Sequence, residues 1–397
     1  MDYVVSATKR TKALETASTP SYVYDELTLD QSLGVADSLR KNGVTKVLFS
    51  LKAFAFVDIL RRACGQIDGF AASSLFEARL ARELIRGLGT VHFTSPGLCK
   101  NEIEKIAELC DYVSCNSLSQ WERFKDILTS RAACGLRVNP KLSFVKDARY
   151  DPCRKHSKLG IPVDQLTVVM ESIPNLLEGV SGLHFHTNCD SDDLSQMLAT
   201  VQHLDVHMWR LLKHVSWINV GGGYLFNNSV SVEPFYEAIQ FLRSKYGVEI
   251  FIEPGAMIID RAGFLVSSVV DLFTSDGKTI AVLDTTVNHM PEVFEYGYEP
   301  DVVGSVDEGG FEYILVGCSC LAGDVFGEYA FNDPLEIGSK VVFENAGAYS
   351  FVKAHMFNGI NLPTIYALTE SGELVLKKQF TYDDFAARCG AHSYATV

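Results

Sequence analysis

Short apolar runs alternate with longer segments of helical periodicity from about Ser21 to residue 260, and this alternation constrains the fold more than any other feature of the 397-residue sequence. Each run rich in β-branched residues predicts a strand, and each segment with apolar residues three or four apart predicts a helix. Eight such units in about 230 residues fit a (β/α)8 barrel better than an open doubly wound sheet. The barrel strands are expected at 46–52, 67–73, 90–96, 112–117, 134–140, 181–187, 217–223 and 249–255.

The pattern changes after Gly263, where β-rich runs are separated by polar turns and long helical segments become rare. This part of the chain predicts an antiparallel β domain. We therefore expect two domains: a barrel over residues 28–262, and a β domain formed by residues 1–27 and 263–397. The opening strand, at 21–26, could belong to either one. Since no Pro- or Gly-rich linker separates the domains, we expect them to pack closely with a site between them.

The charge balance and the absence of long apolar stretches limit the classes of partner that the chain is expected to bind. The chain has 35 Lys and Arg against 49 Asp and Glu, a formal charge of −14, which argues against nucleic-acid binding because such binding depends on cations that neutralise phosphates. This excess of carboxylates is compatible with a cationic substrate, and also with a requirement for solubility alone. No stretch is apolar enough for a signal peptide or a membrane span, and the ten cysteines form no C-x-x-C pair. We expect a cytoplasmic protein with no membrane partner.

Four features lie toward the C-terminal ends of predicted barrel strands, at the edge that forms the active site of barrel enzymes. Lys52 lies between apolar neighbours that would lower its pKa and favour a nucleophilic amine, although an ordinary lysine reaching solvent also fits the position. Gly221, Gly222 and Gly223 let backbone amides approach an anion such as phosphate, or form a plain tight turn. Glu253 ends an apolar strand and needs a partner, either a protonated ring nitrogen of a cofactor or a structural cation.

The fourth feature is the pair His184 and His186, whose imidazoles point to one face of a strand because side chains alternate with a period of two. The spacing permits a metal site, so a metal-dependent barrel hydrolase is an alternative. Since no further set of His and Asp follows at later strand ends, we expect no metal. One imidazole could instead stack under a cofactor ring, or both could simply pack in the core.

The β domain carries a second group of candidates. In the stretch GCSCLAGD, Cys318 and Cys320 face one way on a strand, and Asp324 could orient or tune a thiol, although buried cysteines are usually inert. Tyr349 follows Ala-Gly-Ala, so its hydroxyl has room to reach a phosphate, or it packs in the core. Each feature is ambiguous alone, and their order along the chain is more informative.

Taken in order, FSLKAF, GLHFHT, INVGGGY, EPGAMI, CSCLAGD and ENAGAY resemble a known family over nearly the whole chain. The sequence is similar to the fold type III, alanine racemase-like decarboxylases that depend on pyridoxal 5′-phosphate, a group that includes ornithine, arginine and diaminopimelate decarboxylases. The stretches YDPC, TTVNHMPEVFEY and CSCLAGD are typical of its carboxynorspermidine/carboxyspermidine decarboxylases. The resemblance implies a carboxy-lyase of polyamine biosynthesis with a barrel and a β domain.

The resemblance also assigns site residues. Lys52 would bind the cofactor covalently, Glu253 would keep its ring nitrogen protonated, and Cys320 would protonate the α-carbon after CO2 leaves. In relatives this cysteine comes from the other subunit, which implies a homodimer with shared active sites. The residues that correspond to the cofactor site are Lys52, Arg137, His186, Gly221, Gly222, Gly223, Glu253 and Tyr349.

The substrate assignment rests on a smaller set, His289, Glu292 and Asp324, where carboxylates could receive the ammonium groups of a polyamine tail, or be solvated loop charges. Two positions depart from the patterns of the group. Ala256 replaces an expected acid after Glu-Pro-Gly, and Leu321 follows Cys320 where ornithine-type enzymes carry an acid. A related decarboxylase of diaminopimelate or of a siderophore or specialised-metabolite precursor is therefore an alternative, as is a non-catalytic binding homologue.

Overall fold

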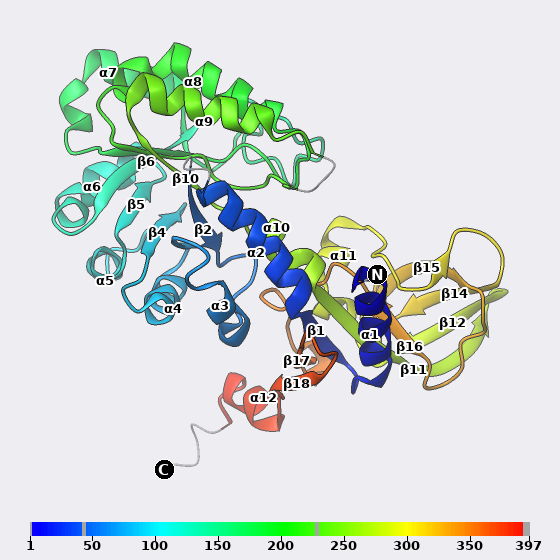
Figure 1. The fold of residues 1–397 in the computed structure, drawn as a ribbon. Helices are drawn as coiled ribbons and strands as arrows, with labels where there is room; N and C mark the ends of the chain where they lie inside the picture. The colour runs from blue at the N-terminus through cyan, green and yellow to red at the C-terminus, as the bar shows by residue number, and fades with distance from the viewer. Residues whose placement is uncertain (1, 42–44, 227–229, 392–397) are drawn as a thin grey trace. The chain divides into compact units, whose positions relative to one another are not determined.

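The computed structural model describes residues 2–41, 45–226 and 230–391. The chain forms two compact units (Figure 1): a barrel unit, Ser32–Ile258, and a β unit, Met1–Gln31 with Ile259–Val397. These bounds fall a few residues from those expected from the change in sequence pattern.

The barrel unit is built on eight parallel strands whose hydrogen bonding closes on itself. Each strand pairs in parallel with the next, β5 pairs with β6, and β10 returns to β2, so the predicted (β/α)8 architecture is confirmed. A short strand, β7 (Ile161–Pro162), extends the sheet beside β6. The barrel strands are β2 (Lys46–Ser50), β3 (Gly69–Ala72), β4 (Thr90–Ser95), β5 (Tyr112–Cys115), β6 (Ala133–Asn139), β8 (Gly182–Phe185), β9 (Trp217–Asn219) and β10 (Glu249–Ile252).

Helices lie on the outside of this barrel (Figure 1), as amphipathic segments between parallel strands must. Local sequence fixes where they begin and end. The Ser74 hydroxyl accepts a hydrogen bond from the Glu77 amide at the start of α4, and Arg86 adopts a left-handed conformation after its last residue. The helices are α2 (Glu26–Lys41), α3 (Val57–Ala63), α4 (Leu75–Ile85), α5 (Ile103–Leu109), α6 (Leu118–Thr129), α7 (Val163–Ser172), α8 (Ser195–Leu212), α9 (Glu233–Tyr246) and α10 (Ala256–Ile259), with the 3₁₀ turn η1 (Pro174–Leu177). Of these, α2 and α10 each cross a boundary between the two units, and the 3₁₀ turn η2 (Asp260–Ala262) belongs to the β unit.

Aromatic side chains fill part of the barrel interior. His92 stacks on Tyr112 with ring centroids 4.2 Å apart, and Trp217 and Phe251 pack against both. A Cβ at Gly182 would lie 1.9 Å from the Trp217 ring, so this glycine leaves the room that the indole needs. Large rings thus replace the branched aliphatic side chains that dominate many barrel cores.

The β unit contains one large sheet with the order β13-β15-β14-β12-β11-β1-β17-β18, and β16 pairs with β11. It differs from the expected antiparallel sheet at two places, because β1 pairs with β17 and β12 with β14 in parallel. Parallel neighbouring strands are joined by long connections, whereas the turn signals in a sequence indicate mainly antiparallel hairpins. The strands are β1 (Ser21–Asp25), β11 (Gly263–Ser275), β12 (Lys278–Leu283), β13 (Ser305–Val306), β14 (Phe311–Val316), β15 (Val325–Phe331), β16 (Lys340–Phe343), β17 (Thr364–Leu368) and β18 (Leu374–Lys378).

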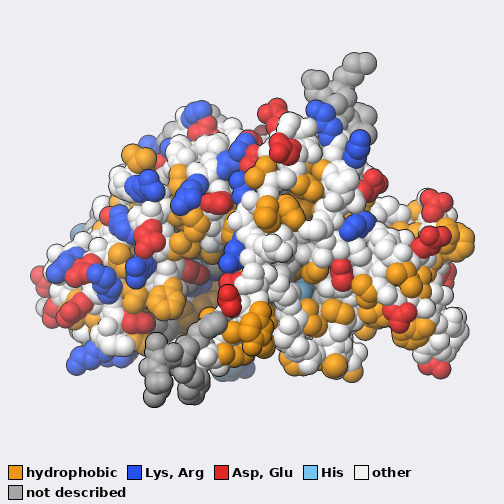
Figure 2. Space-filling view, turned by 90° about the horizontal axis from the view of Figure 1, so that it is seen from below, with side chains coloured by type: hydrophobic (Ala, Val, Ile, Leu, Met, Phe, Trp, Pro, Cys, Tyr) orange, Lys and Arg blue, Asp and Glu red, His pale blue; other side chains and the backbone are white. Residues whose placement is uncertain are grey.

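Membership of β1 in this sheet answers the question that the sequence left open for residues 21–26. The helical elements of the unit are α1 (Asp2–Thr16), η3 (Val287–His289), α11 (Pro291–Tyr296), η4 (Phe357–Gly359) and α12 (Tyr382–Arg388). Over the described ranges, neither unit has a helix with the length and apolarity that a membrane crossing requires. Figure 2 shows Lys and Arg interspersed with Asp and Glu on the face in view, as expected of a mixed-charge surface.

Candidate active site

The carboxyl ends of the barrel strands bring together four ionisable residues that the sequence singled out. Lys52 follows β2, Arg137 lies in β6, His186 follows β8 and Glu253 follows β10. Lys52 and Arg137 each act electrostatically on both His186 and Glu253. The barrel therefore concentrates a lysine, an arginine, a histidine and a glutamate at its C-terminal end.

Lys52 has the environment of a nucleophilic amine. Burial lowers its pKa from the ordinary value, the Glu253 carboxylate opposes this shift, and the Arg137 guanidinium adds to it. The side chain nevertheless remains accessible to solvent. A larger fraction of neutral amine, reachable by a small molecule, is what covalent catalysis by lysine requires.

Glu253 is a largely buried carboxylate held by an amide and close to a histidine. Its Oε1 accepts a hydrogen bond of 2.7 Å from the Asn219 amide, and its Oε2 lies 3.8 Å from His184 Nε2. Burial raises its pKa, while Lys52, the bond from Asn219 and Arg137 lower it. Such a carboxylate gains most from a cationic hydrogen-bond donor brought by a ligand.

His186 is held in a defined orientation as a neutral imidazole. The Gly222 amide donates to its Nδ1 at 3.1 Å. Burial, then the charges of Lys52 and Arg137, hold the pKa of His186 well below its ordinary value. A neutral ring fixed by the backbone can support a flat ligand without adding positive charge to the site.

The Gly221–Gly223 turn needs glycine for the path of the chain itself. Gly221 and Gly223 have φ of 73° and 82°, and a Cβ at Gly222 would lie 2.1 Å from the Glu253 carbonyl oxygen. The Asn219 side chain accepts from the Gly221 amide at 2.9 Å. The sequence left open whether these glycines form a tight turn or an anion-binding one; the tight turn is present, and it places backbone amides beside His186 and Glu253.

Three residues of this site were not singled out from the sequence: Asn219, Glu77 and Cys189. Asn219 links Glu253 to the glycine turn through both ends of its amide group. Glu77 and Cys189 both act electrostatically on Lys52. Asn219 directly precedes Val220 and the glycines at a strand end, which is the one sequence signal that could have drawn attention to it.

His184 lies in the barrel interior. Its side chain is buried and, among the residues with described positions, neither ring nitrogen has a hydrogen-bond partner. Burial, followed by the positive charge of Arg137, holds its pKa well below the ordinary value. Within the ranges 2–41, 45–226 and 230–391, no group of three or more His, Cys, Asp and Glu side chains could hold a metal ion.

The β unit contains the second predicted group of residues. Cys320 is exposed on the loop between β14 and β15, and its amide donates to Asn358 Oδ1 at 2.8 Å. Asp324 closes the same loop, with its carboxylate buried. Cys318 is also exposed, and partial burial of its thiol raises the pKa of that thiol.

The structure gives the three remaining predicted residues different environments. His289 is fully buried, its Nδ1 lies 2.9 Å from the Thr285 hydroxyl, and burial lowers its pKa to about 3. Glu292 is partly exposed and pairs with Lys353 at 3.2 Å. Tyr349 adopts a left-handed backbone with φ of 53°, which is strained for an aromatic residue.

Comparisons with known proteins show which family the chain resembles. The family model described as pyridoxal-dependent decarboxylase, C-terminal sheet domain, matches residues 21–347. The carboxyaminopropylagmatine decarboxylase of Synechocystis sp. is 34% identical over 383 residues, which cover 95% of this chain and 97% of that protein. The carboxynorspermidine/carboxyspermidine decarboxylase of Campylobacter jejuni is 33% identical over 389 residues, covering 94% and 99%.

A solved structure supports the same relationship. The crystal structure of carboxynorspermidine decarboxylase from Campylobacter jejuni, complexed with norspermidine, superposes with a TM-score of 0.85 and 32% identity, covering 94% of this chain and all of that one. Both the fold and the sequence are thus shared over nearly the full length. On these grounds, the chain belongs to the pyridoxal-dependent decarboxylase family.

Proposed function

We propose that this decarboxylase removes CO2 from carboxynorspermidine and carboxyspermidine, using pyridoxal 5′-phosphate bound at the C-terminal end of its barrel. The observation that carries the proposal is the placement of Lys52, an accessible amine of lowered pKa, at the same end of the barrel as the buried carboxylate of Glu253, with which it interacts electrostatically. Relatives named for these two substrates, at 31% to 33% identity over nearly the whole chain, support the substrate class.

The residues of the barrel end fit this cofactor. Lys52 supplies the amine for a covalent bond, Glu253 a carboxylate for a protonated ring nitrogen, and His186 a neutral flat ring. The amides of the glycine turn and the hydroxyl of Tyr349 would hold the phosphate. When bound, the cofactor supplies an electron sink for the electron pair that remains on the α-carbon after CO2 leaves.

The protein residues then have separate tasks. Arg137 adds positive charge that favours the neutral form of Lys52, and so keeps the amine ready for covalent chemistry. Asn219 fixes one oxygen of Glu253, leaving the other to face a cationic donor. His186, oriented by the Gly222 amide, limits movement of the ring that it supports.

Cys320 is proposed to donate a proton from Sγ to the α-carbon of the substrate, in a site completed by a second copy of the chain. Its exposure supports both parts. Exposed apolar side chains lie around its loop: Phe294 is 57% exposed and packs under Gly323, Val325 is 40% exposed and Phe357 is 44% exposed. Such a patch beside a thiol is consistent with a homodimer interface.

Substrate selection is proposed to use the acidic residues of α11. Glu292 and Glu295 both contact the Lys353 ammonium, so this pair already binds one alkylammonium group. A polyamine nitrogen could share these carboxylates with Lys353. His289 has no exposed surface, and the Asp324 carboxylate already accepts hydrogen bonds from the amides of Val287 and Ser319. Direct contact of either side chain with the substrate is a prediction that requires their loops to move.

The relative from Synechocystis makes carboxyaminopropylagmatine a second candidate substrate. Steady-state kinetics with carboxynorspermidine, carboxyspermidine and carboxyaminopropylagmatine test the proposal, with diaminopimelate and ornithine as controls. The proposal predicts the highest kcat/KM for the first two. A preference for carboxyaminopropylagmatine, whose distal group is a guanidinium, would replace it with the second candidate, and a preference for diaminopimelate would contradict both.

A further inference from the structure

The loop that carries Cys320 is fastened at two places by side chains that the proposed chemistry does not use. At its base, the buried Asp324 carboxylate accepts hydrogen bonds from the Val287 amide at 2.8 Å and the Ser319 amide at 3.0 Å, and from the Ser319 hydroxyl. A Cβ at Gly317 would lie 2.2 Å from this carboxylate, so Gly317 leaves room for it. Asp324 therefore joins the cysteine loop to η3.

At its apex, the loop has a different contact. The amide of Cys320 itself donates to Asn358 Oδ1 at 2.8 Å. Asn358 has φ of 58° and ψ of 11°, a left-handed conformation, and the adjacent Gly359 also has a positive φ of 72°. Asparagine tolerates this backbone better than other residues with a side chain, and its short amide group stays close to the main chain.

The two contacts hold different parts of the cysteine loop. Asp324 holds the base of the loop, whereas Asn358 contacts the residue whose thiol must meet the substrate. Cys318, the neighbouring exposed thiol, has its amide bound to the Thr285 carbonyl at 2.9 Å instead. A substitution at Asn358 should therefore alter the position of Cys320 and leave Cys318 in place.

We infer that Asn358 is a positioning residue that holds Cys320 in place for proton delivery to the α-carbon. The inference rests on the proposed function, because it assigns Asn358 a role through the thiol that the proposed function uses as the acid.

Asn358→Gly is the variant that isolates the side-chain contact, because glycine adopts the same left-handed backbone without strain. Asn358→Asp restores an acceptor oxygen of the same reach. Asn345→Gly is the matched control, since Asn345 also has a positive φ, 53°, in the same unit, and its amide binds Asp301 instead. Cys320→Ala calibrates how much the acid contributes to turnover.

The first measurement uses the protein without cofactor: hydrogen exchange of the Cys320 amide, resolved by NMR or fragmentation mass spectrometry. We expect exchange to rise about fivefold in Asn358→Gly, the factor for one lost hydrogen bond. It should stay unchanged in Asn345→Gly and return toward the wild-type rate in Asn358→Asp. An unchanged rate in Asn358→Gly would overturn the contact on which the inference rests, whatever the enzyme's substrate is.

The second measurement compares kcat and KM in the loaded enzyme. Asn358→Gly should lower kcat by a large part of the loss seen in Cys320→Ala and leave KM within about twofold, because proton delivery follows binding. If kcat is normal in Asn358→Gly but reduced in Cys320→Ala, the positioning role is wrong while the acid assignment stands. If kcat is normal in Cys320→Ala itself, the acid assignment of the proposed function fails and the inference fails with it.

Discussion

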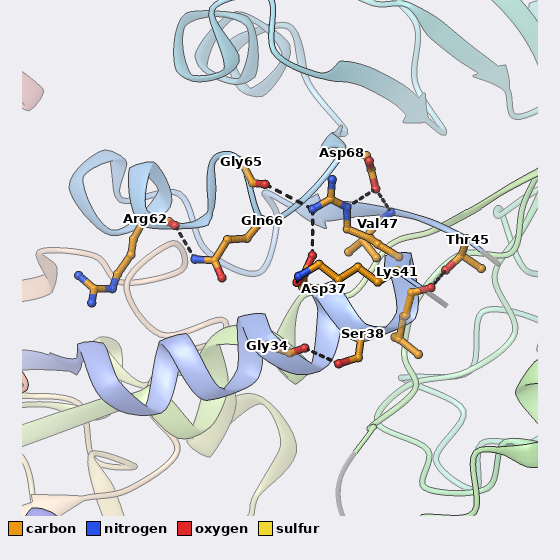
Figure 3. Close-up of polar contacts among 12 residues, drawn as sticks. Gly34, Asp37, Ser38, Lys41, Thr45, Val47, Arg62, Gly65, Gln66 and Asp68 are labelled. Atoms are coloured by element: carbon orange, nitrogen blue, oxygen red, sulfur yellow. Dashed lines mark hydrogen bonds and ion pairs between the residues drawn. The ribbon is translucent and has the colours of Figure 1, made fainter. Parts of the chain in front are cut away.

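The two ends of the barrel use the same kinds of charged residue in opposite ways. At the C-terminal end, Lys52, His186 and Glu253 are desolvated and their pKa values are displaced by burial. At the N-terminal end, Arg40 binds Asp68 at 3.0 Å and Asp37 at 3.3 Å, and Lys46 pairs with Glu249. Figure 3 shows Asp37, Val47 and Asp68 among the polar contacts at this end. One end holds ionisable groups that burial desolvates, and the other holds charges that neutralise one another.

The comparison shows that a hollow does not by itself identify the site. A depression of about 950 Å³ lies at the N-terminal end, lined by Asp37, Arg40, Lys46, Asp68 and Glu249 among others. Its charges are engaged in ion pairs and backbone hydrogen bonds that fasten strand ends together. Chemistry is expected instead where burial displaces the pKa values of titratable groups, and structural support where charged groups are paired at the surface.

Lys52→Ala is the change with the largest expected effect. Removing the amine at the C-terminal end should lower kcat/KM by on the order of 10³-fold or more, since a group that acts covalently has no substitute nearby. The visible absorbance of covalently bound cofactor should disappear, while the melting temperature of the cofactor-free protein is maintained. Full activity or an unchanged spectrum in this variant would show that another lysine carries the chemistry.

Glu253→Gln is expected to have the next largest effect. A neutral amide cannot stabilise positive charge on a ring nitrogen, so kcat should fall by about 10²- to 10³-fold, as for other preorganised electrostatic groups. Stability in urea should change by less than about 1 kcal/mol, because the buried charge that is removed lacks a full ion pair. A large loss of stability with normal kcat would mean that the carboxylate is structural.

Asp68→Asn tests the opposite end. Asp68 Oδ2 accepts from the Val47 amide at 2.8 Å and from Arg40 Nε, so it fastens the start of β2. The amide variant should lose about 1–2 kcal/mol of unfolding free energy, measured by urea denaturation, with kcat within about twofold of wild type. A drop in kcat without a loss of unfolding free energy would show that the N-terminal end contributes to catalysis. That result would contradict the contrast between the two ends of the barrel.

The smallest expected effect concerns pH. Lys52 has a folded-state pKa below its ordinary value of 10.5, so the unfolded state binds more protons between the two values. Its charge is therefore a cost to folding at neutral pH, and that cost is relieved as pH rises through this window. In cofactor-free protein, Lys52→Met should be more stable than wild type at pH 7, and the difference should shrink toward pH 10.5.

Urea denaturation of both proteins across this pH range checks the prediction. The expected gain is modest, because the lysine side chain remains in contact with solvent. A stability difference that grows with pH, rather than shrinking, would show that Lys52 is stabilised as an ammonium in the folded state.

The sequence predicted the elements of the fold because strand and helix patterns are local. The eight barrel strands lie at the expected runs, and Lys52, His186 and Glu253 lie near strand ends, where parallel strands must place them together. The parallel pairing of β1 with β17 was missed, since these strands are more than 330 residues apart and no turn signal connects them.

Other contacts could not be predicted for a related reason. Asn358 and Cys320 meet only because η4 folds back on the cysteine loop, and the link between Asp324 and Val287 joins segments from different strand connections. Lys353, which neutralises Glu292 and Glu295, follows β16 in the chain. Such long-range polar contacts have no periodic signature in the sequence.

Borohydride reduction of the enzyme with bound pyridoxal 5′-phosphate, followed by peptide mass spectrometry, tests the central claim most directly. Reduction makes the bond between a lysine and the cofactor permanent, so the modified residue can be identified after digestion. We predict one pyridoxyl group per chain, on the peptide that contains Lys52 at the C-terminal end of the barrel. Modification of another lysine, or an unmodified Lys52 peptide in an enzyme that releases CO2, would contradict the assignment of this end of the barrel as the active site.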